Sequence, residues 1–136
     1  MDFYLNLEKI SIHFEMLEVD ENDTNSIRFQ VNVKLDHSTG SFSYSANDIW
    51  IDTEMWDAFE RQVSQNLEEA ARFYDQSNYF EIHLTKDYQN IYFVLIAKEP
   101  LVPKGQIALE SEQKLDIDGP FIEELRESLK SFPKFW

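Results

Sequence analysis

Ile27-Arg28-Phe29-Gln30-Val31-Asn32-Val33-Lys34-Leu35 alternates apolar and polar residues without a break, and this stretch decides the fold. Successive side chains of a β-strand point to opposite faces, so strict alternation predicts a strand with one face in the core and the other in solvent. The turn residues Asp36 to Gly40 follow, and Phe42, Tyr44 and Ala46 then resume the alternation. The two runs together predict an antiparallel hairpin.

Further strands are predicted on both sides of this hairpin. Ile49 and Ile51 fall out of phase with Ala46, which predicts a β-bulge at Asn47-Asp48. Ile91 to Ala97 is apolar throughout, and such a run predicts a central strand that is covered on both faces. The remaining strand signals have a period of two and comprise Ile10, Ile12, Phe14 and Met16; Phe80, Ile82 and Leu84; and Ile107, Leu109, Leu115 and Ile117, the last four giving one or two strands.

Two stretches have the three-and-four spacing of an amphipathic helix. The first would begin after Asp52 or Thr53 as the cap and run for up to about six turns. Its stripe is Trp56, Phe59, Val63, Leu67, Ala70 and Tyr74. The second would be capped by Asp118 and end at Pro133, with the stripe Phe121, Ile122, Leu125, Leu129 and Phe132.

These elements predict an α+β fold with a single domain over residues 1–136. We expect a mainly antiparallel β-sheet of about six strands, one long central helix and one C-terminal amphipathic helix, in the order βββαβββα. No internal sequence repeat is apparent.

The charge is strongly acidic, with 12 basic residues against 26 acidic ones and a net charge of −14. Phosphate backbones and anionic lipids repel such a protein, so we expect no direct binding to nucleic acid or membranes. Two interpretations of the charge stay open: solubility, or an electrostatic match to a basic partner. The absence of Cys and of a signal-like segment at the start of the sequence predicts a cytoplasmic location.

No residue pattern indicates a catalytic or metal site, and no cofactor is expected. His13 and His83 lie on the polar phase of predicted strands, His37 lies in a turn, and none has the spacing of a zinc site. Asp116 and Asp118, on either side of Ile117, come nearest to a pair of catalytic carboxylates.

Several segments resemble the WapI-type immunity proteins and related small acidic immunity families of bacterial polymorphic toxin systems. The resemblance runs from about Phe29 to Phe132. It rests on Gly40-Ser41-Phe42-Ser43-Tyr44, Ile49-Trp50-Ile51, the helix opening with Trp56 and Phe59, Phe80-Glu81-Ile82-His83-Leu84, and Leu115-Asp116-Ile117-Asp118 before Phe121-Ile122-Glu123-Glu124-Leu125. It implies a non-enzymatic cytoplasmic protein that binds and neutralises a cognate toxin domain, and it carries over no site residues.

Two acidic clusters are the candidate partner-binding residues. Asp57, Glu60 and Glu68 would lie along one solvent-facing side of the long helix, and Asp20, Glu21 and Asp23 would form a second cluster in a turn.

Trp50, Phe135 and Trp136 either cover the far face of the sheet or form an exposed contact patch. The alternative functions are a housekeeping adaptor or structural subunit, and a small carboxylate-dependent enzyme. The sequence does not determine the oligomeric state.

Overall fold

The chain forms two four-stranded antiparallel sheets and two helices in the computed structural model, which describes residues 2–20, 22, 25–102, 105–117, 119–134 and 136. The first sheet has the order β1 (Asp2–Asn6), β2 (Ile10–Asp20), β3 (Ser26–His37) and β4 (Gly40–Asp52). The second has the order β5 (Ala71–Tyr74), β6 (Phe80–Asp87), β7 (Asn90–Val102) and β8 (Gly105–Asp116). Helix α1 (Thr53–Ser64) joins the two sheets, and α2 (Phe121–Ser131) follows the second. The predicted α+β class is confirmed.

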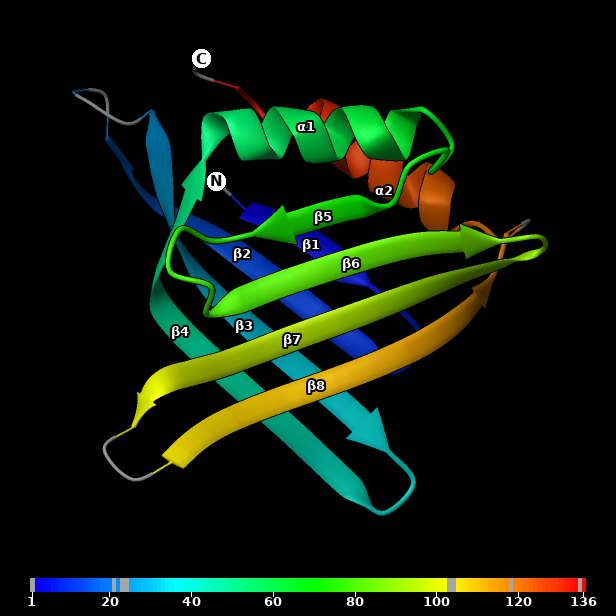
Figure 1. Ribbon diagram of the computed structural model, residues 1–136, viewed down its shortest axis with the longest axis horizontal. Helices are drawn as coiled ribbons and strands as arrows, with labels where there is room; N and C mark the ends of the chain where they lie inside the picture. The colour runs from blue at the N-terminus through cyan, green and yellow to red at the C-terminus, as the bar shows by residue number, and fades with distance from the viewer. Residues whose placement is uncertain (1, 21, 23–24, 103–104, 118, 135) are drawn as a thin grey trace.

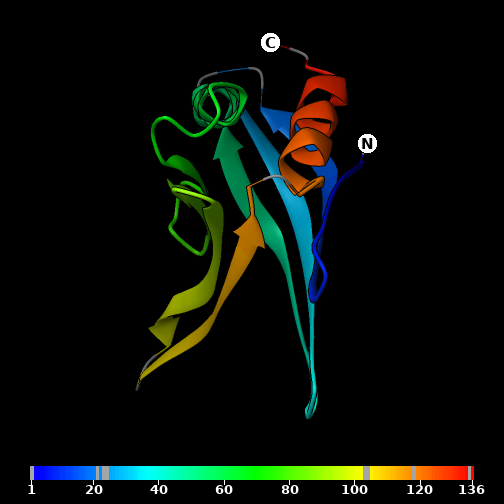
Figure 2. The ribbon, with the colours of Figure 1, turned by 90° about the vertical axis from the view of Figure 1, so that its right-hand side faces the viewer.

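The two sheets face each other, and the helices lie side by side at one end of them (Figure 1). Away from the helices the sheets spread apart (Figure 2). Phe14 of β2 makes edge-on ring contacts with Phe73 of β5 and Phe80 of β6, at centroid distances of 5.5 Å and 5.7 Å. Both sheets therefore contribute to one hydrophobic core.

The predicted hairpin is confirmed, with its bulge. Val31 pairs with Ala46 but Phe29 pairs with Ile49, so β4 holds an extra residue around Asn47 and Asp48. The apolar residues of β3 from Ile27 to Val33 lie in the core, and Leu35 is half-buried against it.

The expectation of about six strands in the order βββαβββα is wrong in two places. Strand β1 precedes the first expected strand, and β5 follows α1, so the observed order is ββββαββββα. Both are edge strands of four or five residues. A run so short contains too few alternations to produce a clear period-two signal.

Helix α1 is half as long as the apolar stripe predicts. It ends at Ser64, and Asn66 and Leu67 then take left-handed backbone angles, with φ of 58° and 56°. Leu67 stays buried, but from Ala71 the chain has a period of two, with Ala71 and Phe73 in the core and Arg72 and Tyr74 outside. Ala70 and Tyr74 have helical spacing in the sequence, but both lie after the end of α1.

The two other differences concern β7 and α2. On β7, Phe93 and Leu95 are fully buried, but Val94 and its neighbours on the opposite face are only half-buried, so the expectation of full cover on both faces is wrong. Helix α2 begins at Phe121 with Pro120 in the N-cap position. The expected cap, Asp118, lies outside the described residues.

The element order repeats, although no repeat is apparent in the sequence. Each half consists of four meandering strands followed by a helix. The buried positions Trp56, Phe59 and Val63 of α1 correspond at a constant offset to Ile122, Leu125 and Leu129 of α2. Each helix contacts the first strand of the other half, α1 against β5 and α2 against β1. The two halves are thus interlocked.

Candidate functional site

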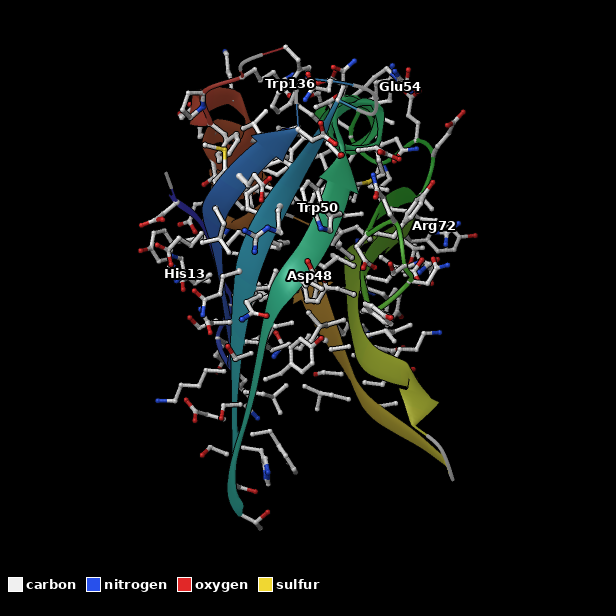
Figure 3. The ribbon with its side chains drawn as sticks, turned by 90° about the vertical axis from the view of Figure 1, so that its left-hand side faces the viewer. His13, Asp48, Trp50, Glu54, Arg72 and Trp136 are labelled. Carbon is white, nitrogen blue, oxygen red and sulfur yellow. The ribbon has the colours of Figure 1, made fainter. Side chains whose placement is uncertain are left out.

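Acidic residues of three elements lie toward the end of the molecule where α1 begins. Asp20 of β2 pairs with Ser26 of β3, which pairs in turn with Asp52 of β4. The Thr53 amide, the first of α1, donates to the Asn25 carbonyl at 2.9 Å, which fixes the helix beside the β2–β3 turn. We call Asp20, Asp52, Glu54, Asp57 and Glu60 the acidic end. Figure 3 shows Glu54 and Trp136 at this end of the molecule.

Asp52 has a different role from the one its position suggests. It occupies the N-cap position of α1, but its carboxylate makes no hydrogen bond to the helix amides. It accepts a hydrogen bond from Gln76 Nε2 at 2.6 Å instead, and the Gln76 amide donates to the Trp50 carbonyl at 2.9 Å. Asp52 therefore ties the β5–β6 connection to the end of β4.

Asp57 and Glu60 lie on α1 as predicted, and the C-terminal segment binds both. Lys134 Nζ lies 2.8 Å from Asp57 Oδ1 and 2.6 Å from Glu60 Oε2. Partial burial alone would lower the pKa of Lys134, but the hydrogen bonds to the two carboxylates outweigh it and raise the pKa. The sequence held no signal for this contact, because Lys134 is distant from α1 in the chain.

Glu68 is not part of this group, so the prediction of three acids on one helix side is wrong. It lies in the turn after α1, at the opposite end of the helix from Glu54. Asp20 belongs to the acidic end, and its Oδ1 accepts a hydrogen bond from the Asn22 amide at 3.0 Å. The other two predicted residues of its cluster, Glu21 and Asp23, lie outside the described residues.

Two of the three unplaced aromatic residues lie at the surface. Trp136 is 37% exposed, its indole nitrogen donates to Asp57 at 3.0 Å, and its ring meets buried Trp56 edge-on at 6.4 Å. Trp50 lies on the outer face of β4, where it donates to Asp48 at 3.1 Å beneath the Arg28 guanidinium (Figure 3). Phe135 lies outside the described residues. Trp136 thus places a partly exposed aromatic ring next to Asp57 of the acidic end.

The histidines have ordinary surface partners. His13 stacks on Tyr4 at 4.4 Å, His37 stacks on Phe42 at 5.2 Å, and His83 Nε2 lies 2.6 Å from Glu81. No group of three or more metal-ligating side chains occurs within the described part of the chain.

The acidic residues that the structure describes offer no clear catalytic pair. Asp116 is exposed at the end of β8, and Asp118 is not described. Asp75 is buried, but its Oδ1 accepts hydrogen bonds from the amides of Tyr79 and Phe80 at 2.7 Å and 3.0 Å, which close its own turn. This is the geometry of a structural turn carboxylate.

Comparison with known proteins finds no significant match to a family model, to a curated protein or to a solved structure. Among the helices that the structure describes, none is long and apolar enough to cross a membrane.

Proposed function

We propose that the protein is a non-enzymatic binding protein of the cytoplasm that neutralises a basic bacterial toxin domain. The observation that carries the proposal is the acidic end, to which β2, β4 and α1 contribute five acidic residues. The resemblance to small acidic immunity proteins supplies the toxin as the partner. The net charge of −14 agrees with a basic partner.

Charge of this kind acts mainly on the rate of association. Complementary potentials steer two proteins together and raise the association rate constant, and salt screens this effect beyond about 10 Å at 0.1 M. A nuclease active site is built to bind phosphates, so a cluster of carboxylates is a competitor for it. Trp136 adds an exposed aromatic ring beside the carboxylates, and aromatic residues dominate many interface energies.

The test compares two pairs of charge reversals. Asp20→Lys with Glu54→Lys changes the acidic end without touching the carboxylates that hold Lys134. Glu68→Lys with Glu69→Lys makes the same change in charge in the exposed turn at the far end of α1. Each variant is co-expressed with the toxin domain encoded beside the gene, and association rates are measured by stopped flow at low and high salt.

We expect the first pair to slow association at least tenfold at low salt, with little difference at high salt, and to weaken rescue of growth. The second pair should associate nearly as fast as the wild type. Equal behaviour of both pairs would mean that net charge, and not the acidic end, governs binding. Failure of the wild type to rescue growth would overturn toxin neutralisation.

A further inference from the structure

Strand β1 is an edge strand whose outward amides can be identified from the hairpin that follows it. The Leu7 amide donates to the Ile10 carbonyl at 2.8 Å, which makes Leu7 and Ile10 a hydrogen-bonded pair. Such pairs alternate with non-bonded pairs in an antiparallel ladder. Asn6 and Tyr4, which pair with Ser11 and His13, therefore direct their backbone amides away from β2.

The equivalent edge in the second half is closed by a helix. The Asp75 amide donates to the Phe80 carbonyl, so by the same alternation Arg72 and Tyr74 of β5 direct their amides outward. Gln62 Oε1 of α1 accepts from the Arg72 amide at 3.2 Å, and Met55 Sδ accepts from the Tyr74 amide at 3.4 Å. Helix α1 thus satisfies the outer edge of β5.

Helix α2 does not do the same for β1. At the offset that superimposes the buried faces of the helices, Gln62 corresponds to Ser128 and Met55 to Phe121. Both residues line a groove of about 370 Å³ between β1 and α2. Within the described residues, no hydrogen bond joins α2 to the outward amides of Tyr4 and Asn6. Figure 2 shows β1 and α2 on the same side of the molecule.

The groove is acidic and partly aromatic. Glu124 and Glu127 of α2 line it together with Tyr4, whose side chain is 51% exposed. Asp2 and Glu15 are paired directly across β1 and β2, an arrangement of like charges that destabilises a sheet. His13 Nε2 lies 3.6 Å from Asp2 Oδ1. Partial desolvation, then Asp2 and Glu15, raise the pKa of Tyr4.

We propose that this groove binds an extended basic segment of another protein, which adds to β1 as a fifth strand of the first sheet. The open amides of Tyr4 and Asn6 supply main-chain hydrogen bonds. The carboxylates of Glu124 and Glu127 in the groove, and those of Asp2 and Glu15 on the exposed face of β1 and β2, select lysine or arginine side chains. A second copy of this chain fits poorly, because pairing two β1 strands would bring two acidic grooves together. The inference does not depend on the partner being a toxin.

The test uses the heptapeptide acetyl-Lys-Val-Lys-Thr-Lys-Val-Lys-amide and two versions of it, one N-methylated at the lysines and the other at the residues between them. Neighbouring amides of a strand face opposite edges, so each version has one edge blocked. We expect one methylated peptide to bind like the parent and the other at least tenfold more weakly, by calorimetric titration. The parent should also slow hydrogen exchange at Tyr4 and Asn6.

A matched pair of variants tests the charge selection. Glu124→Gln with Glu127→Gln should weaken the parent peptide at least threefold, while Glu68→Gln with Glu69→Gln, an equal loss of charge elsewhere, should leave it unchanged. Equal binding of both methylated peptides, equal loss of both, or no binding of the parent would each overturn strand addition. Sedimentation as a dimer with protected Tyr4 and Asn6 amides would show a self-interface instead. None of these results bears on rescue from a toxin.

Discussion

Asp75 is buried, whereas the other acidic residues whose burial the structure describes are partly or fully exposed. Its side chain is 1% exposed, and its Oδ2 is buried without a hydrogen-bond partner. Burial raises the pKa of Asp75 above 3.8, although hydrogen bonds from the amides of Phe80 and Tyr79 oppose the shift. The charged form therefore costs stability that the turn hydrogen bonds only partly offset.

The replacement Asp75→Asn should stabilise the protein at pH 7. Because the folded-state pKa is raised, the contribution of Asp75 to stability is fully present below its unfolded pKa and is lost as the pH rises through the folded pKa. Asparagine keeps an acceptor at Oδ1 and carries no charge. Urea unfolding should show an advantage of the variant over the wild type that is largest at pH 7 and shrinks toward pH 4.

Asp75→Ala is the matched control, because it removes the charge and the acceptor together. Two backbone amides then lose their partner, which should cost about 1–3 kcal/mol at every pH. If Asp75→Asn is destabilised as much as Asp75→Ala, the turn requires a carboxylate and the expected pH dependence is wrong.

At the scale of residues, the sequence predicted the core better than the contacts of charged groups. The alternation identified the buried side chains from Ile27 to Val33 correctly, because a period of two assigns each residue to a face without any knowledge of its partners; Leu35, at the end of the run, is half-buried. The ion pairs of Lys134 with Asp57 and Glu60 depend on tertiary structure alone. The buried turn position of Asp75 was not predicted, because the apolar stripe indicated a helix through Tyr74, where the structure has strand β5.

Among the elements, β7 has one face that is buried between the sheets and an opposite face that is only half-buried. Leu95 is 0% exposed and lies between the sheets, whereas Val94 is half-buried on the outer face, paired with His83 of β6 and Glu112 of β8. Leu95→Asp would leave an unpaired charge in the core and should abolish soluble expression.

Val94→Asp should remain soluble and folded, because the new carboxylate can reach solvent. Its closeness to Glu112 should cost about 1 kcal/mol, and Val94→Lys, which avoids the like-charge pair, should be closer to the wild type. Soluble yield and melting temperature are measured for all three variants. Insolubility of both Val94 variants would mean that the outer face of β7 is covered.

The lengths of the elements were harder to predict than their types. The stretch Ser64-Gln65-Asn66 has low helix propensity, but the apolar spacing continues through it to Tyr74. Tertiary structure decides whether the helix ends at this stretch or continues to Tyr74. Asn66 and Leu67 take left-handed backbone angles that turn the chain. Arg126 of α2 donates to the Val63 carbonyl at 3.1 Å and also to Asn66. A partner in the other half of the chain thus ends the helix.

For the whole molecule, the repeat of ββββα units was hidden by small changes in register. Phe3-Tyr4 and Phe73-Tyr74 precede Ile12-His13 and Ile82-His83 at the same distance. Yet Tyr4 pairs with His13, whereas Tyr74 pairs with Glu81 and Arg72 with His83. The residues that are identical in the two halves therefore do not occupy equivalent positions in β1 and β5. Such matches are also too few to indicate a repeat from one sequence.

The interlocking of the halves predicts that neither folds alone. Trp56 contacts Phe73 at 5.6 Å and Phe132 at 4.6 Å, so the first helix completes its packing with residues of the second half. Each half alone would also expose the core face of its sheet, and a chain of that length is already marginal in stability. Fragments divided between Glu68 and Glu69 should each lack a cooperative unfolding transition by circular dichroism. Their equimolar mixture should regain the near-ultraviolet aromatic signal of the intact chain, which should itself unfold in one step. Cooperative unfolding of either fragment alone, or two separate transitions in the intact chain, would show that the halves are independent.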